Sequence, residues 1–315
     1  MFEDAVKEVR KSKLIYVVAH INPDGDAIGS TYAIYFALKE LGKDVHVIMP
    51  SYSSVFDFLP GIENRVDSIK EDECDLLICT DASDHTRLAL SEEDFQKAKK
   101  VIMIDHHQIS RPYGDYRYID DLKSSASEIT FHFIKELGIE FTSDIATHLY
   151  TGIMTDTGSF NYNNTSAATL RTTAELVEYG AKYIEVCKRL NDTMKESKLR
   201  LVAKTIDNME SFYDGKLRFS YVSYDTINNL GINDEESEGM TNYLRSIEGC
   251  EVAVYVRGRS DGTLKASLRS NGKVDISKIA IEFGGGGHPR AAGYTLREDL
   301  KIEKEKLIKA VGEMI

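Results

Sequence analysis

Carboxylate and imidazole side chains follow four apolar runs of this sequence, at points where a buried strand or helix would end. The residues are His20, Asp24 and Asp26 after the first run, Asp81 after the second, Asp105, His106 and His107 after the third, and Asp156 after the fourth. One such residue is more often a helix cap or a turn residue than a metal ligand. Because they accumulate here, and because none is a thiolate, the set indicates a site for Mn²⁺ or Mg²⁺ rather than a structural zinc site.

Six of these side chains, all except Asp105 and His107, are too many for one ion that also keeps open positions for water and substrate. Two divalent cations about 3.5–4 Å apart, sharing one carboxylate, would use all six. Such a pair lowers the pKa of coordinated water, so that a bridging hydroxide can attack phosphorus in line while the paired charges stabilise the transition-state oxygens. The residue types therefore predict phosphoester hydrolysis assisted by two metal ions.

Alternating strand and helix patterns in the first half of the chain would bring these residues together. Short apolar runs predict strands, and apolar residues at helical spacing predict helices. The predicted strands are 14–19, 45–49, 76–80 and 101–104, and the predicted helices are 2–12, 27–42, 127–138 and 143–154. This order is typical of a parallel sheet flanked by helices, in which ligands gather beyond the carboxyl ends of the strands.

The second half of the chain has a different organisation. From residue 167 to about 212 the pattern is helical and is interrupted only at Gly180, after which strand patterns return. Strands are predicted at 217–223, 251–257, 263–269 and 294–296, with helices at 236–247 and 275–283. We therefore predict an α/β protein with a catalytic two-metal domain at 1–185, a helical connector at 186–212 and a smaller α/β substrate-binding domain at 213–315.

The composition limits the class of partner. The 315 residues carry a net charge of −12, to which residues 1–210 contribute −11. A protein this acidic is not suited to holding long nucleic acid on a broad basic surface, so any nucleic-acid partner should be short. The four cysteines form no Cys-x-x-Cys pair, and no apolar run approaches the roughly 20 residues of a membrane span. We expect a cytoplasmic protein with reduced cysteines and no membrane partner.

A run of four glycines at 284–287, followed by His288 and Arg290, indicates a second kind of site. A glycine run alone would favour a flexible connection. Here its backbone N–H groups can approach an anion closely, and His288 and Arg290 add side-chain donors at the same place. Arg269 ends a predicted strand, from which a guanidinium can bind phosphate with two parallel hydrogen bonds. These residues predict a clamp for an anionic substrate.

Four motifs in this order resemble those of the DHH phosphoesterases, a family that includes RecJ exonucleases and manganese pyrophosphatases. The motifs are VAHINPDGDAIGS at 18–30, CTDASD at 79–84, IDHH at 104–107 and GIMTDTGSF at 152–160. Near the carboxyl terminus, KASLRS at 265–270 and FGGGGHPRAAG at 283–293 resemble the DHH-associated substrate domain of the stand-alone subgroup that acts as nanoRNase and pAp phosphatase. The resemblance covers nearly the whole chain.

The resemblance implies a role for each of these residues. It implies that the first cation is held by His20 and Asp24, the second by Asp26, His106 and Asp156, and that Asp81 bridges the two. It implies that Asp105 orients the histidines, and that His107 faces the substrate phosphate as an electrophile or as a proton donor to the leaving oxygen. The simpler alternative for the histidine pair is one ligand beside one packed residue. In the second domain, the substrate's terminal phosphate or nucleotide would be bound by Arg269, Ser270, Gly286, Gly287 and His288.

We therefore expect hydrolysis of short oligoribonucleotides (nanoRNA) to mononucleotides, with dephosphorylation of pAp as a second activity. Two cations serve as cofactors, with Mn²⁺ favoured and Mg²⁺ as the alternative. If one domain binds an end of the substrate and the other cuts near it, molecules of two to a few nucleotides are favoured over long polymers. The sequence is compatible with a homodimer and does not determine the oligomeric state.

Three other functions are alternatives to this one. Cleavage of pApA or cyclic di-AMP would use the same cations and the same clamp, so it stays an open alternative. A manganese pyrophosphatase is disfavoured, because a glycine-rich clamp with the single Arg269 does not resemble a pocket for a small inorganic tetra-anion. A sensor that binds a nucleotide without cutting it is disfavoured because every expected metal ligand is present.

Overall fold

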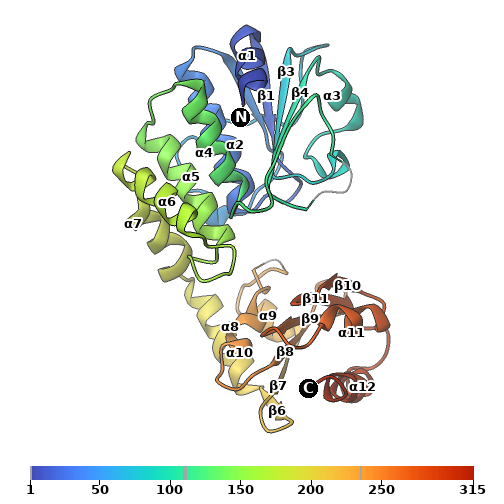
Figure 1. The fold of residues 1–315 in the computed structure, drawn as a ribbon. Helices are drawn as coiled ribbons and strands as arrows, with labels where there is room; N and C mark the ends of the chain where they lie inside the picture. Colours follow the sequence, from blue (N-terminus) through green and yellow to red (C-terminus); the bar gives the residue numbers. More distant parts are fainter. Residues whose placement is uncertain (1, 109–111, 235) are drawn as a thin grey trace. The chain divides into compact units, whose positions relative to one another are not determined.

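The computed structural model describes residues 2–108, 112–234 and 236–315. It divides the chain into two compact units, Met1–Thr193 and Met194–Ile315, each with its own sheet and core (Figure 1). Each unit is an α/β structure, as the alternating patterns predicted.

The first unit is built on a five-stranded sheet in which every pair of neighbours is parallel, in the order β2-β1-β3-β4-β5. The strands are β1 (Leu14–Val18), β2 (Asp44–Ile48), β3 (Leu76–Thr80), β4 (Val101–Asp105) and β5 (Tyr116–Ile119). All five residues of β3 and all five of β4 are buried. Continuous apolar runs form such strands because both faces of a parallel sheet are covered. The predicted parallel sheet is confirmed.

Helices cover both faces of this sheet, with α1, α2 and α4 on one side and α3 on the other (Figure 1). A further layer, formed by α5, packs against α2 and α4. The helices are α1 (Glu3–Lys11), α2 (Gly25–Glu40), α3 (Glu92–Gln96), α4 (Ala126–Leu137), α5 (Ser143–Asp156), α6 (Ala167–Glu178) and α7 (Tyr183–Cys187), followed by a π-helical turn at Lys188–Asp192.

Two glycines allow α2 and α5 to pack backbone against backbone. A Cβ atom on Gly29 would lie 2.4 Å from the carbonyl oxygen of His148, and one on Gly152 would lie 1.9 Å from Oγ of Ser127 on α4 and 2.8 Å from Oδ1 of Asp26. A larger residue at Gly29 would therefore force α2 and α5 apart, whereas one at Gly152 would displace the side chains of Ser127 and Asp26. The contact brings the first turn of α2, which carries Asp26, beside the last turns of α5.

His148 on α5 lies at the centre of this packing and is fully buried. Its Nε2 donates to the carbonyl oxygen of Pro60 at 2.9 Å, and its ring stacks on Tyr32 with 5.3 Å between centroids. Burial lowers the pKa of His148 to about 4, against the hydrogen bond to Pro60, which raises it. The folded protein therefore holds this imidazole neutral at pH values where an exposed histidine is protonated.

This buried histidine predicts a loss of stability in acid. Because the pKa of His148 is lower in the folded protein than in the unfolded chain, the unfolded chain takes up the proton first as the pH falls. The contribution of His148 to the free energy of unfolding is therefore complete above about pH 6.5 and is lost as the pH falls to about 4. The loss should amount to about 3 kcal/mol. Urea unfolding at pH 7 and pH 4.5 should show a steeper decline for the wild type than for His148→Gln, whose amide keeps a donor for Pro60. Parallel declines in the two proteins would contradict this assignment.

The second unit contains a mixed six-stranded sheet in the order β10-β11-β9-β8-β7-β6, in which only β7 and β8 pair in parallel. One face packs on α11 and α12, and the other packs on α8, α9 and α10. The strands are β6 (Glu210–Phe212), β7 (Leu217–Val222), β8 (Val252–Gly258), β9 (Leu264–Ser270), β10 (Gly286–His288) and β11 (Ala291–Thr295). The helices are α8 (Glu196–Asp207), α9 (Tyr224–Asn229), α10 (Met240–Arg245), α11 (Ile276–Glu282) and α12 (Leu300–Gly312).

The structure differs from the predicted elements at several short strands. Residues Glu210–Phe212, to which the helical pattern extended, form β6, because Asp214 and Gly215 take left-handed backbone angles and turn the chain into a hairpin with β7. The last strand begins at Ala291 rather than 294, since it pairs with β10, and β10 lies within the glycine run, for which no strand was predicted. Neither β5 nor α12 was predicted.

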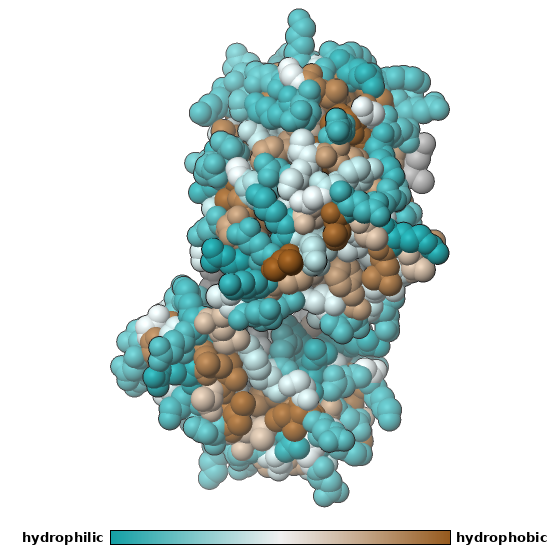
Figure 2. Space-filling model, turned by 90° about the vertical axis from the view of Figure 1, so that its left-hand side faces the viewer, coloured by the Kyte–Doolittle hydropathy of each residue, from teal (hydrophilic) through white to brown (hydrophobic). Residues whose placement is uncertain are grey.

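None of the helices in the described part of the chain combines the length and the apolar character that a membrane-spanning segment needs. On the face drawn in Figure 2, hydrophilic residues predominate and apolar residues form smaller groups between them.

Candidate metal centre

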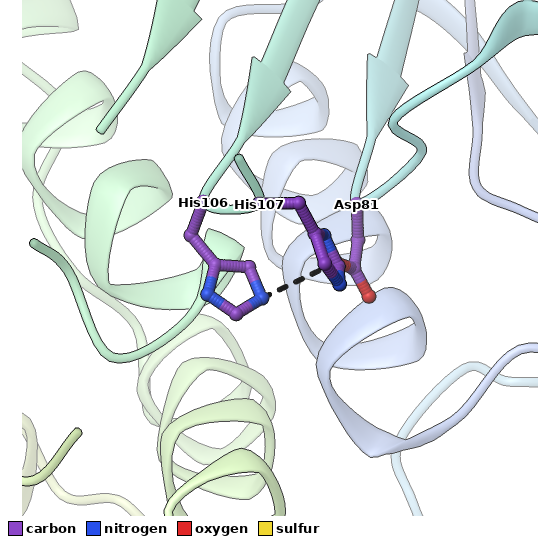
Figure 3. Close-up of side chains that lie close together, drawn as sticks. All are labelled: Asp81, His106 and His107. Atoms are coloured by element: carbon purple, nitrogen blue, oxygen red, sulfur yellow. Dashed lines mark ion pairs between the residues drawn. The ribbon is translucent and has the colours of Figure 1, made fainter. Parts of the chain in front are cut away.

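The carboxyl ends of three neighbouring strands place histidine and aspartate side chains at one edge of the first sheet. His20 follows β1 by two residues, Asp81 comes directly after β3, and Asp105 ends β4 immediately before His106 and His107. Because these strands are parallel, the side chains emerge at the same edge. Figure 3 shows Asp81, His106 and His107 converging there from the ends of β3 and β4.

Two helices complete the centre. Asp24 and Asp26 lie at the start of α2, and Asp156 is the last residue of α5. Ligand atoms that lie within 4.8 Å of one another define three groups of residues. These groups are His20, Asp24 and Asp81; Asp26, His106 and Asp156; and Asp81, His106 and His107. All six predicted ligands therefore belong to one continuous cluster.

Asp81 connects the first two of these groups through different oxygen atoms. Its Oδ2 lies 3.6 Å from Nε2 of His20, whereas its Oδ1 lies 3.7 Å from Nε2 of His106. The side chain is buried, and Oδ1 has no hydrogen-bond partner among the described residues. A buried carboxylate oxygen without a donor is costly unless a cation or another donor reaches it.

His20 and His106 each direct a ring nitrogen toward the carboxylates of the cluster. Nδ1 of His20 lies 2.7 Å from the carbonyl oxygen of Ile21, and when it donates there it leaves the Nε2 lone pair facing Asp81. Nε2 of His106 faces Asp26 at 3.9 Å and Asp156 at 3.7 Å. This set of imidazole and carboxylate donors fits divalent cations such as Mn²⁺ or Mg²⁺.

Burial and mutual repulsion disturb the titration of the aspartates. The pKa of Asp81 is well above its usual range, because the group is buried and because Asp26 and Asp24 lie near it. For the same reasons the pKa of Asp156 rises to about 8. Burial also raises the pKa of Asp26, against the opposing effect of His106. The carboxylates repel one another, so bound positive charge would stabilise their ionised form.

Asp24 and Asp26, which a simple turn would use only as helix caps, have different surroundings. Oδ1 of Asp24 does cap α2, since it accepts the backbone N–H groups of Asp26 and Ala27 at 3.0 and 3.1 Å. Asp26 instead accepts the N–H groups of Ala126 and Ser127 from α4. The capping interpretation therefore holds for Asp24 beside its place in the cluster, and it does not describe Asp26.

Two residues at or near the cluster have an unfavourable backbone conformation. Asp81 has a φ of 54°, and so does Asn22, to which we assign no metal role. A left-handed conformation is unfavourable for residues other than glycine, although aspartate and asparagine tolerate it best, and it is often found at functional sites. At this position the two carboxylate oxygens of Asp81 face His20, which follows β1, and His106, which follows β4.

Asp105 holds His107 rather than extending toward solvent. Its Oδ1 accepts the backbone N–H of His107 at 2.9 Å and lies 2.7 Å from Nδ1 of the ring. This hydrogen bond raises the pKa of His107, against the opposing effect of its burial. About half of the His107 side chain is exposed, and Asp105 fixes the orientation of the ring.

In the second unit, strand pairing brings Arg269 and His288 near each other. Ala291 on β11 pairs with Arg269 on β9 and with His288 on β10. Side chains of paired residues lie on the same face, so the arginine and the histidine flank a single small methyl group. The edge strand β10 also carries Gly286 and Gly287, both exposed. Four of the five predicted clamp residues therefore lie together on this part of the sheet.

Ser270 differs from the other clamp residues. It is buried, and its Oγ accepts the backbone N–H of Gly272 at 3.1 Å. By the alternation of the strand, its side chain points away from the face that carries Arg269. Direct contact between Ser270 and a substrate stays a prediction.

The two clamp glycines should respond differently to substitution. A Cβ atom on Gly287 would lie 2.5 Å from the carbonyl oxygen of Ala291, at a φ of 142° that other residues avoid, whereas one on Gly286 meets no atom of the described residues within 4 Å. Gly287→Ala should therefore lower the free energy of unfolding by roughly 1–3 kcal/mol, while Gly286→Ala should not. Thermal unfolding checks this difference. If Gly286 contacts substrate, its alanine variant should raise KM without a loss of stability, and equal effects of the two substitutions on stability would contradict the assignment.

The sequence-based reasoning missed Asn164. Its Nδ2 donates to the backbone oxygen of Asp156 at 3.1 Å and lies 3.4 Å from the carboxylate oxygen Oδ2 of the same residue. No local signal marks this asparagine, because its role depends on where the turn after α5 places it.

Two family models and several known proteins match this chain. Residues 14–153 match the model of the DHH family, N-terminal domain, and residues 215–315 match that of the DHHA1 domain. The bifunctional oligoribonuclease and PAP phosphatase NrnA of Thermus thermophilus is 35% identical over 302 residues, which cover 95% of this chain and 89% of that protein. The protein of the same name from Bacillus subtilis is 27% identical over 304 residues, covering 94% of this chain and 93% of the relative.

A solved structure shares the whole architecture. The crystal structure of an exopolyphosphatase-related protein from Bacteroides fragilis superposes with a TM-score of 0.89 at 27% identity, covering 98% of this chain and 95% of that one. The likeness extends over both units of the chain.

Proposed function

Since this chain belongs to the DHH family and carries its associated DHHA1 domain, we propose that it is a metal-dependent phosphoesterase that hydrolyses short oligoribonucleotides to mononucleotides and dephosphorylates pAp. The observation that carries the proposal is the continuous cluster in which Asp81 connects two groups of possible ligands through its two oxygen atoms. The names of the Thermus and Bacillus relatives support the substrate class.

We assign catalysis to the first unit and substrate binding to the second. In the first, His20 and Asp24 would hold one cation, Asp26, His106 and Asp156 the other, and Asp81 both. Mn²⁺ is favoured by the mixture of imidazole and carboxylate donors. When bound, such cations neutralise phosphate charge and make water more acidic.

The remaining residues position the substrate and move a proton. His107, held by Asp105, would donate its proton to the oxygen that leaves phosphorus, which avoids the release of an unstabilised alkoxide. In the second unit, the guanidinium of Arg269 and the imidazole of His288 would bind a terminal phosphate, and the open space beside Gly286 would admit it close to the backbone.

A ranking of initial rates tests this function. Purified protein loaded with Mn²⁺ should be mixed with labelled RNA of two to about 20 nucleotides, with pAp, with pApA and with cyclic di-AMP. We expect rates on RNA of two to five nucleotides at least about tenfold above those on the longest strand, measurable release of phosphate from pAp, and complete loss of both activities in EDTA. Equal rates on short and long RNA would contradict the proposal, and a dominant rate on cyclic di-AMP would favour the alternative substrate.

A further inference from the structure

The carboxylate of Asp26 is held by the backbone that begins α4. The N–H of Ala126 donates to Oδ2 at 2.6 Å and that of Ser127 donates to Oδ1 at 2.9 Å. Asp26 is fully buried and faces His106. The position of this possible ligand therefore depends on where residues 124–127 lie.

The same short segment also reaches Asp156. Nδ2 of Asn164 donates to the carbonyl oxygen of Ser124 at 3.0 Å and to that of Asp156 at 3.1 Å. Two of the three members of the group formed by Asp26, His106 and Asp156 are thus tied to residues 124–127, one directly and one through a single side chain.

Glu128 holds this segment through hydrogen bonds to Ser124. It is completely buried, and its Oε2 accepts the N–H of Ser124 at 3.0 Å, the hydroxyl of Ser124 at 2.7 Å and the hydroxyl of Thr169 at 2.9 Å. Its Oε1 accepts from Nζ of Lys123 at 3.1 Å. Burial raises the pKa of Glu128, but the hydrogen bonds from Ser124, Lys123 and Thr169 outweigh it and hold the pKa below its usual range.

We propose that Glu128 is a positioning residue, which sets the geometry of the cation site formed by Asp26, His106 and Asp156 without touching the cation. A buried carboxylate is costly compared with an apolar residue of the same size, and four donated hydrogen bonds are directed at this one. Two of its donor residues, Lys123 and Ser124, lie within four residues of Ala126 and Ser127. The backbone N–H groups of Ala126 and Ser127 are those that hold Asp26. The inference rests on the proposed function, because it requires that the cluster bind cations.

Replacement by glutamine tests this role. Glu128→Gln keeps the size of the side chain, but its amide N–H₂ group is itself a donor and faces the donors of Ser124, Lys123 or Thr169. Residues 124–127 should shift, and with them Asp26. We expect the affinity for Mn²⁺ at one of two sites, measured by titration calorimetry on the full chain, to fall about 10- to 100-fold while the other stays unchanged. The spin-coupled electron paramagnetic resonance signal of a manganese pair should weaken in parallel, and excess Mn²⁺ should restore kcat.

Glu303 provides a matched control in the second unit. It is also buried, and its Oε1 accepts the backbone N–H groups of Arg297 and Glu298 at 2.5 and 2.8 Å. Glu303→Gln should lower the thermal stability of the protein without changing either Mn²⁺ affinity.

The possible results separate the two proposals. Wild-type affinity of Glu128→Gln for both ions would overturn the positioning role, as would equal weakening at both sites, while the proposed function would stand. Absence of Mn²⁺ binding by the wild type would overturn both.

Discussion

Asp81→Asn should lower kcat on a diribonucleotide at least about 10³-fold, a loss of roughly 4 kcal/mol of transition-state stabilisation. The reason is that Asp81 is the member of the cluster whose two oxygens face different groups of ligands. Asparagine keeps the size of the side chain and tolerates the left-handed backbone at this position, so the variant should fold. The measurement is kcat at saturating Mn²⁺, with thermal unfolding of the same preparation.

Asp84→Asn is the control for this substitution. Asp84 lies three residues further along the same loop, where its Oδ1 accepts the N–H of Thr86 at the start of a short turn. Its variant should keep wild-type kcat. If Asp81→Asn retained more than a tenth of the wild-type rate, the shared carboxylate could not be essential, and the two-cation arrangement would have to be abandoned.

His107→Gln should lower kcat on RNA about 10²- to 10⁴-fold, the usual contribution of a proton donor. The deficit should depend on the leaving group. A ribose oxygen needs a proton as it departs, whereas p-nitrophenolate leaves without one, so the variant should lose less than about tenfold on a p-nitrophenyl ester of a nucleotide. Rates on the two substrates, measured for wild type and variant, give the test.

His46→Gln controls for the loss of a histidine from the same unit. His46 lies in the middle of β2 and stacks on Tyr16, away from the strand ends that carry the cluster. The His46→Gln variant should therefore keep the wild-type rate on both substrates. An equal deficit of His107→Gln on the two substrates would show that His107 acts on the phosphate or on the cations rather than on the leaving oxygen.

The sequence was sufficient to predict the elements that carry the ligands. The bounds of β3 are those of the predicted strand, because Leu76–Thr80 is an apolar run whose residues are all buried, and the polar Asp81 ends it. Asp105, His106 and His107 follow β4 in the same way. Strands that are buried on both faces of a parallel sheet leave a continuous hydrophobic pattern in the sequence.

Interactions between distant parts of the chain could not be predicted in this way. Glu128 reads as an ordinary helix residue, and its role appears only when Thr169, 41 positions away, is placed beside it. The strand β10 could not be predicted from the sequence, because its glycines have no side chains to show the alternation typical of a strand. It is identified by its pairing with β11. The alignment of Arg269 with His288 through Ala291 is likewise a matter of strand register.

The close approach of α2 and α5 at Gly29 and Gly152 affects the size of the cation that the cluster could hold. Asp26 and Asp156 belong to these two helices, whose separation is limited by main-chain atoms in contact rather than by flexible side chains. A wider ion such as Ca²⁺ would need carboxylates that lie further apart, and a methyl group at Gly29 would move the two helices apart. The packing at Gly29 would then contribute to discrimination between cations of different size, alongside the identity of the ligands.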